Sequence, residues 1–221
     1  MPSIMEWIDG LFPVLAKGGW MMWPILGLSI GTVAIVLERL WFLMVRGNRI
    51  VSRPFLAEAQ ERLRKGQVDE AVVACRKDGS MMARILLAGL AFAGSSRSVV
   101  REALADAGRR ETRELDRFLG TLTAIAGVAP LLGFLGTVLG MVQIFQEISQ
   151  KHIGQYEALA GGIYVALYTT VFGLIVAVPA YLAYRAFSGI ADRKREDMED
   201  WAVDLMNTLD KAAGRKNGDA L

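Results

Sequence analysis

Two residue types that build many catalytic and metal sites are almost missing from this sequence. Among 221 residues there is one cysteine, Cys75, and one histidine, His152. A single cysteine forms no intrachain disulfide, and a lone histidine without companion ligands does not make a metal site. No phosphate-binding loop or nucleophile constellation is present either. We interpret Cys75 as a small apolar residue on a helix, with a reactive thiol beside Arg76 and Lys77 as the alternative.

Charged side chains are missing from three long stretches. Hydrophobic residues make up 53% of the chain and charged residues 22%, yet no Asp, Glu, Lys or Arg occurs within residues 18–37, 118–146 or 158–184. A helix needs about 20 apolar residues to cross the hydrocarbon core of a membrane. The sequence therefore predicts an all-α membrane protein with three transmembrane helices. The second and third stretches exceed the required length, which predicts tilt or continuation beyond the bilayer.

The basic residues predict the orientation of these helices. If the three stretches cross a membrane in turn, the segments on one side of it carry two basic residues, Lys17 before the first stretch and Lys151 between the second and third. The other side carries the bases that follow the first stretch, precede the second and follow the third: Arg46, Arg49, Arg53, Arg62, Arg64 and Lys65; Arg109, Arg110, Arg113 and Arg117; and Arg185, Arg193, Lys194 and Arg195. Because basic loops stay in the cytoplasm, the amino terminus is predicted outside and the carboxyl terminus inside.

The first 19 residues have an amphipathic pattern. Their large apolar side chains recur at helical spacing on one face: Ile4, Trp7, Ile8, Leu11, Phe12 and Leu15. This pattern predicts a helix lying on the outer membrane surface. A frayed extension of the first span is the alternative, since Gly10 and Pro13 weaken a helix.

Residues 46–117 form a polar block with helical periodicity. The segment from Ser98 to Asp116 carries oppositely charged pairs four residues apart, and no Gly-Pro punctuation separates it from the second span. We expect one long helix from about Ser98 to Gln146. The third span is expected to continue as a helix in the same cytoplasmic bundle, followed by a disordered tail after Gly214.

The second and third spans each carry hydroxyls on a face of small residues. Thr137 lies nine residues from Gln146, and Thr170 lies twelve residues from Ala158 on the antiparallel helix, which places the two hydroxyls at depths of roughly 14 and 18 Å. Small residues surround them at spacings of three and four: Gly133 and Gly140 in the second span, and Gly162, Ala166, Thr169, Gly173, Ala177 and Ala180 in the third. Such stripes allow another helix to approach closely.

Each of these features has a plainer interpretation. A membrane threonine often bonds its own i−4 carbonyl, and small stripes often pack helices within one subunit. We favour that interpretation for Thr169, and a polar path for Thr137 and Thr170. Glu38 and Arg39, near the cytoplasmic end of the first span, are weaker candidates for an ion exit route; snorkelling or pairing with the cytoplasmic bundle is the alternative.

Three motifs resemble the MotA/TolQ/ExbB proton-channel family. They are VLERLWFL at residues 36–43, LTAIAGVAPLLGFLGTVLGMVQIF at residues 122–145, and GGIYVALYTTVFGLIVAVPAYLAY at residues 161–184. The resemblance covers roughly residues 20–205, and the chain length is more similar to the TolQ/ExbB branch than to the flagellar stators. Many ExbB-type members carry a glutamate where this chain has Val165.

The resemblance implies a pentamer in the bacterial inner membrane, whose second and third helices surround a single-span partner of the ExbD/TolR type. Protons, or alternatively sodium ions, would pass at that interface and drive work on the envelope, with a TonB/TolA-type transducer as a further partner and no cofactor. It implies pore threonines at Thr137 and Thr170, and the pore face is expected at Gly133, Gly140, Ala166, Gly173 and Ala177. A non-conducting membrane scaffold is the alternative function.

The expected organisation follows from these observations. It comprises a periplasmic amphipathic helix (1–19), transmembrane helix 1 (20–44), a cytoplasmic helical domain (45–117), transmembrane helix 2 (118–146), a periplasmic connection (147–157), transmembrane helix 3 (158–186), and a cytoplasmic helix with a disordered tail (187–221). No Asp, Glu, His or Lys lies in the second or third span, so the titrating acid is expected on the partner.

Overall fold

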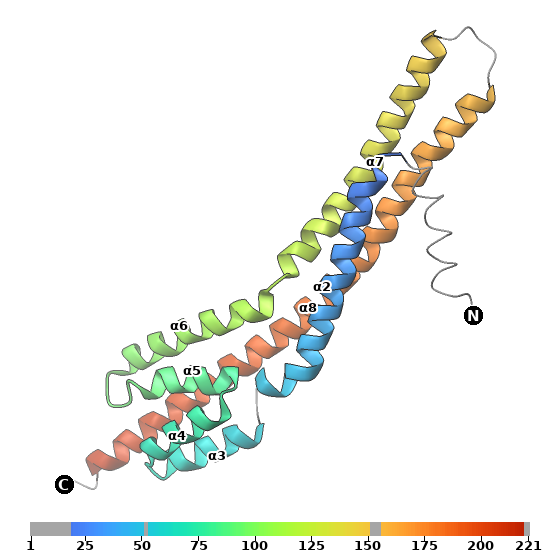
Figure 1. The fold of residues 1–221 in the computed structure, drawn as a ribbon. Helices are drawn as coiled ribbons and strands as arrows, with labels where there is room; N and C mark the ends of the chain where they lie inside the picture. Colours follow the sequence, from blue (N-terminus) through green and yellow to red (C-terminus); the bar gives the residue numbers. More distant parts are fainter. Residues whose placement is uncertain (1–18, 51–52, 151–155, 219–221) are drawn as a thin grey trace, which may run out of the picture. The chain divides into compact units, whose positions relative to one another are not determined.

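The computed structural model describes residues 19–50, 53–150 and 156–218, and these ranges contain helices and no strands. The predicted all-α class is therefore confirmed. The helices, labelled as in Figure 1, are α2 (Met22–Ile50), α3 (Arg53–Arg64), α4 (Val68–Asp78), α5 (Met81–Leu90), α6 (Arg97–Asp116), α7 (Leu119–Gln150) and α8 (Tyr156–Gly218). The expected amphipathic helix before Gly19, and His152, lie outside the described residues.

Three helices are long and apolar enough to cross a membrane, as predicted. The candidate spans are Met22–Leu43 in α2, Leu119–Gln146 in α7, and a window within Ala160–Thr208 of α8. Only 22% of the apolar window is buried in α2 and in α7, and 35% in α8. Exposing so much apolar surface to water would be costly, so lipid or further subunits must cover it. The orientation of these spans stays a prediction.

The chain divides into two compact units. One, called here the membrane-helix unit, comprises the chain up to Glu38 together with Phe118–Ala186. Its centre is a cluster of buried apolar residues from α2, α7 and α8: Ile25, Ile125, Ala129, Val176, Ala177 and Ala180. The small alanines in this cluster let the three helices pack closely.

The other unit, called here the polar unit, comprises Arg39–Arg117 and Phe187–Leu221. Its central element is α5, which is buried along most of its length. The helix α4 ends where Gly79 adopts the left-handed conformation (φ 63°). Ser80 is the N-cap of α5, and its hydroxyl accepts a hydrogen bond from the Ala83 N–H. Glycine at C′ and serine at the N-cap are favoured for these roles. Cys75 is buried on α4, as the apolar interpretation predicted.

The expected single helix from Ser98 to Gln146 is wrong. The helix α6 ends at Asp116, Arg117 is extended, and α7 begins at Leu119. Between them Phe118 has a φ of 64°, a left-handed conformation that costs a non-glycine residue about 1–2 kcal/mol. This conformation interrupts the hydrogen-bond ladder, which restarts when Leu122 N–H donates to the Phe118 carbonyl. The left-handed position itself is occupied by phenylalanine and not by glycine.

The third predicted span does continue beyond the apolar stretch. The helix α8 runs without interruption from Tyr156 to Gly218 and contributes to both units. Pro179 lies inside it. The tail expected to be disordered after Gly214 is instead helical up to Gly218.

Candidate functional site

The backbones of α7 and α8 touch at a pair of glycines. A Cβ atom on Gly173 would lie 2.6 Å from the Ala129 carbonyl oxygen and 3.1 Å from the Gly133 Cα atom. A Cβ atom on Gly133 would lie 2.8 Å from the Thr169 carbonyl oxygen. These neighbours are backbone atoms that cannot rotate away, so only glycine fits at either position.

Thr169 lies at the centre of this contact. Its side chain is 1% exposed, and its hydroxyl lies within hydrogen-bond distance of two carbonyl oxygens, Ala166 at 2.7 Å and Gly133 at 3.1 Å. A Cβ atom on Gly136 would come within 2.7 Å of the Thr169 Cβ atom. The single hydroxyl proton of Thr169 is therefore shared between its own helix, at i−3 and not at the expected i−4, and α7.

The two threonines predicted to form an ion path are half-buried. The Thr170 hydroxyl donates to the Gly133 carbonyl oxygen at 3.2 Å, and the Thr137 hydroxyl donates to the Phe134 carbonyl oxygen at 2.6 Å. Each hydroxyl has one proton to donate, and that proton is used here. Their lone pairs remain available as acceptors. Their part in ion movement stays a prediction.

The small-residue stripe packs α7 against α8 of the same chain. A Cβ atom on Gly140 would lie 3.0 Å from the Ala166 Cβ atom, and Ala177 belongs to the buried cluster of the membrane-helix unit. Gly133 and Gly173 touch as described above. The small residues of each helix therefore pack against the other helix of the same subunit. Their exposure to a pore stays a prediction. Gly136 belongs to the same contact and was not singled out from the sequence, although its spacing of three from Gly133 was a usable signal.

Large apolar side chains cover the opposite faces of these helices. On α7 the exposed ones include Val128, Leu131, Phe134, Leu135, Val138, Val142 and Phe145, and on α8 they include Leu167, Val171, Leu174, Ile175, Val178 and Leu182. No acidic side chain, lysine or histidine occurs in these two spans. Val165 lies within α8. The described residues also contain no cluster of three metal-ligating side chains.

Arg39 belongs to the polar unit, whereas these threonines belong to the membrane-helix unit. Its side chain is 2% exposed, and its Nη1 atom donates to the carbonyl oxygens of Glu114 at 3.1 Å and Leu115 at 3.3 Å. These carbonyls lie in the last turn of α6, where a helix has unpaired acceptors and a partial negative charge. The Arg39 guanidinium also lies 5.2 Å from the centre of the Phe42 ring. Arg39 therefore binds the carboxyl-terminal end of α6, while Glu38 is exposed and is the last residue of its segment of the membrane-helix unit.

Comparison with known proteins identifies the family. The model of the MotA/TolQ/ExbB proton channel family matches residues 77–200, which include α5, α6, α7 and most of α8. The chain belongs to the MotA/TolQ/ExbB family. The match spans the glycine contact, Thr137 and Thr170, so the family assignment rests on the helices described above.

Relatives within this family carry ExbB and TolQ names. A biopolymer transport protein named ExbB-like 3 from Synechocystis is 32% identical over 78% of this chain and 82% of its own length. The biopolymer transport protein exbB1 of Vibrio cholerae is 31% identical over 82% of this chain and 80% of its own length. The Tol-Pal system protein TolQ of Haemophilus influenzae is 30% identical over 47% of this chain and 46% of its own length. These similarities support the TolQ/ExbB branch.

Proposed function

We propose that this chain is the channel and stator subunit of a motor in the bacterial inner membrane, which converts proton-motive force into mechanical work on the cell envelope. Membership of the MotA/TolQ/ExbB proton channel family supports this proposal, as do relatives named for biopolymer transport and for the Tol-Pal system. In the proposed arrangement the amino terminus is periplasmic and the carboxyl terminus is cytoplasmic. Five copies surround a single-span partner of the ExbD/TolR type, and a TonB/TolA-type protein receives the work.

One observation carries the division of labour between the subunits. The spans on α7 and α8 contain hydroxyls but no acidic side chain, lysine or histidine. Proton transfer across a low-dielectric core requires a group that exists in both charged and neutral forms, and threonine does not titrate. The proton-binding carboxyl group therefore belongs to the partner. The lone pairs of Thr137 and Thr170 serve as hydrogen-bond acceptors for water or for that protonated carboxyl group.

Proteoliposomes test this proposal directly. The variants Thr137→Val and Thr170→Val keep the side-chain shape and remove the hydroxyl. Thr123→Val is the matched control, because Thr123 is exposed and its hydroxyl donates to the Leu119 carbonyl of its own helix. The first two variants are expected to lower proton flux through the co-reconstituted pair, while the control retains it. Equal proton flux through all three variants would show that the hydroxyls of Thr137 and Thr170 are not part of the ion path.

Two further measurements separate a conducting motor from a scaffold. Vesicles that contain this chain alone are expected to conduct far fewer protons than vesicles with the partner, and equal conduction would contradict the division of labour. Native mass spectrometry of the intact complex in mild detergent is expected to give five copies of this chain. A scaffold instead predicts no proton conduction in vesicles that contain both proteins.

A further inference from the structure

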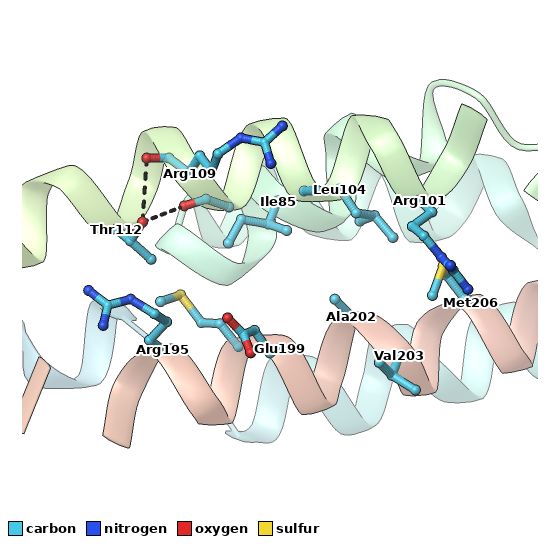
Figure 2. A pocket seen from close by; sticks show the side chains of 13 residues that line it. Ile85, Arg101, Leu104, Arg109, Thr112, Arg195, Glu199, Ala202, Val203 and Met206 are labelled. Atoms are coloured by element: carbon cyan, nitrogen blue, oxygen red, sulfur yellow. Dashed lines mark hydrogen bonds between the residues drawn. The ribbon is translucent and has the colours of Figure 1, made fainter. Parts of the chain in front are cut away.

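The polar unit contains a groove between α6 and the later part of α8 (Figure 2). The two helices run antiparallel, because Arg97 bonds Asn207 near one end, at 3.4 Å, and Asp116 pairs with Arg195 at the other, at 3.0 Å. Between these contacts lies a cavity of about 530 Å³ whose floor includes Ile85 of α5. Ligand sites in proteins typically have volumes of about 300–1,000 Å³.

Small residues make this groove hollow. Ala105 and Gly108 on α6 face Ala202 on α8, and the adjoining apolar walls come from Leu104, Met198 and Met206. A Cβ atom added to Gly108 would meet no other atom within 4 Å. Protein interiors are normally filled to crystal-like density, so an apolar hollow with open space beside Gly108 is suited to receiving side chains from another molecule.

The rim of the groove is basic. Arg101 and Arg109 on α6 and Arg195 on α8 line it, together with the single acidic residue Glu199. Arg101 makes no hydrogen bond or ion pair with any residue that the structure describes. Arg109 pairs with Asp106, and Arg195 with Asp116 and Asp192, but exposed pairs are weak and a guanidinium has five N–H donors. The rim therefore retains capacity for carboxylates.

The dimensions match a short helix. The lining residues extend from Arg101 to Thr112 on α6 and from Arg195 to Met206 on α8, which is about 16 Å, or three turns, on each wall. A helix bound in such a groove places apolar side chains at i, i+3 or i+4, and i+7 on the floor. The arginines favour acidic residues on its flanks.

A second copy of this chain does not offer such a helix through α8. The outward face of α8 in the polar unit carries exposed acidic side chains without a large apolar stripe: Glu196, Asp197, Asp200 and Asp204. Its apolar residues Met198 and Met206 already line the groove. We propose that the groove binds a short, acidic, amphipathic helix from a different protein. This proposal does not depend on ion conduction.

Fluorescence anisotropy with the full-length protein in mild detergent tests this binding. The probe is a labelled synthetic peptide of about 12 residues with leucines at i, i+4, i+7 and i+11 and glutamates beside them. The comparison peptide has lysines in place of the glutamates. We expect the acidic peptide to bind at least about tenfold more tightly, because the lysine peptide faces the arginine rim. Signal from empty micelles is measured for both peptides, since amphipathic peptides enter detergent.

Substitutions in the groove locate the site. Ala202→Leu and Ala105→Leu fill the hollow from opposite walls, and Arg101→Glu reverses the charge at the rim; each is expected to weaken the acidic peptide about tenfold or more. Arg76→Glu, on the exposed surface of α4 and outside the groove, is the matched control. Circular dichroism and thermal unfolding identify any variant that does not fold. If one of the two leucine variants fails to fold, the leucine variant on the opposite wall of the groove serves as the test.

Three results would overturn the proposal. Equal affinity for the acidic and lysine peptides would remove the charge argument. Tight binding of oleate with no binding of the acidic peptide would assign the groove to a small anionic amphiphile. Disulfide cross-linking between copies through Gly108→Cys, in a Cys75→Ala background, would assign it to a second copy of this chain. None of these results bears on proton flux, so the proposed function stands or falls separately.

Discussion

The hydroxyl of Thr169 lies 3.1 Å from the carbonyl oxygen of Gly133, on the neighbouring membrane helix. The contact joins two consecutive spans, α7 and α8. The apolar stretches of these spans, residues 118–146 and 158–184, contain no charged side chain. Thr170 donates to the same carbonyl oxygen. Gly133 is thus the point at which both adjacent threonines of α8 are joined to α7.

Removing the Thr169 hydroxyl is expected to loosen this pair of helices. Thr169→Val keeps the shape and is expected to cost about 0.6–2 kcal/mol of unfolding free energy, the range measured for hydrogen bonds between membrane helices. Thr169→Ser retains the hydroxyl and is expected to lose less. Reversible unfolding in mixed detergent and SDS micelles measures both. Thr123→Val, which removes a bond within one helix, is expected to change stability little; a loss equal to that of Thr169→Val would refute the assignment.

The contacting glycines are expected not to accept a methyl group. Gly173→Ala places its Cβ against the Ala129 carbonyl oxygen and the Gly133 Cα atom, and overpacking of this kind costs about 1–3 kcal/mol. Gly127→Ala is the matched control on α7, because a Cβ there meets nothing within 4 Å. The same unfolding assay compares them. If Gly173→Ala were as stable as Gly127→Ala, the close approach of α7 and α8 would be wrong.

Arg39 is expected to stabilise the end of α6. Arg39→Met removes the donor to the Glu114 and Leu115 carbonyls and a positive charge at a helix carboxyl terminus, which together predict a loss of about 2–4 kcal/mol. Arg113→Met removes an exposed arginine from the same helix and is expected to have an effect below about 0.5 kcal/mol. Hydrogen exchange at the last turn of α6 provides a local measurement. Unchanged protection there in Arg39→Met would contradict the capping role.

Cys75 is expected to react slowly in the folded protein. Burial, reinforced by the negative charge of Asp78, raises the pKa of the Cys75 thiol from its ordinary 9.0 to about 11. Two pKa units reduce the thiolate population about 100-fold at neutral pH, before any steric protection. Ellman's reagent at pH 8 is expected to label Cys75 only after denaturation. A cysteine at the exposed Val73, in a Cys75→Ala background, is expected to react at once; similar rates would contradict the burial.

The same shift predicts a pH dependence of stability. Because the folded-state pKa is raised above the unfolded value, the unfolded chain loses its thiol proton first as the pH rises. The contribution of the neutral thiol to the free energy of unfolding is fully present below about pH 9. It is lost progressively as the pH rises from about 9 to 11. Cys75→Ala is expected to abolish that part of the alkaline decline in unfolding free energy, and a parallel decline in the variant would exclude the thiol as its cause.

The sequence predicted the membrane helices well because lipid imposes a strong compositional constraint. It missed the break at Phe118, since no proline lies nearby, Gly120 follows the break and does not occupy it, and the segment reads as continuous helix. The structure places the carbonyls of Glu114 and Leu115 against Arg39, which lies 75 and 76 residues earlier in the chain. A helix end that is stabilised by a distant side chain leaves little signal in local sequence.

The stripe of small residues was recognised, but not the helix that it contacts. Spacing shows that Gly133 and Gly140 share a face; it does not show that Ala166 and Thr169 of the same chain fill that face. The groove in the polar unit was missed for a related reason. Ala105, Gly108 and Ala202 are ordinary helix residues in the sequence, and the hollow between them exists only once α6 and α8 lie side by side.

The glycine contact also bears on how the protein is made. The helices α7 and α8 follow one another in the chain, and the atoms that join Gly133 to Gly173 and Thr169 all belong to these two helices. Their pairing therefore requires no other subunit and is available as soon as α8 leaves the insertion machinery. A substitution at Gly173 would act on the newly inserted chain, and cells would respond by degrading it. The first measurable effect of such a substitution would be a low amount of the protein in the membrane. The molecules that escape degradation would assemble normally.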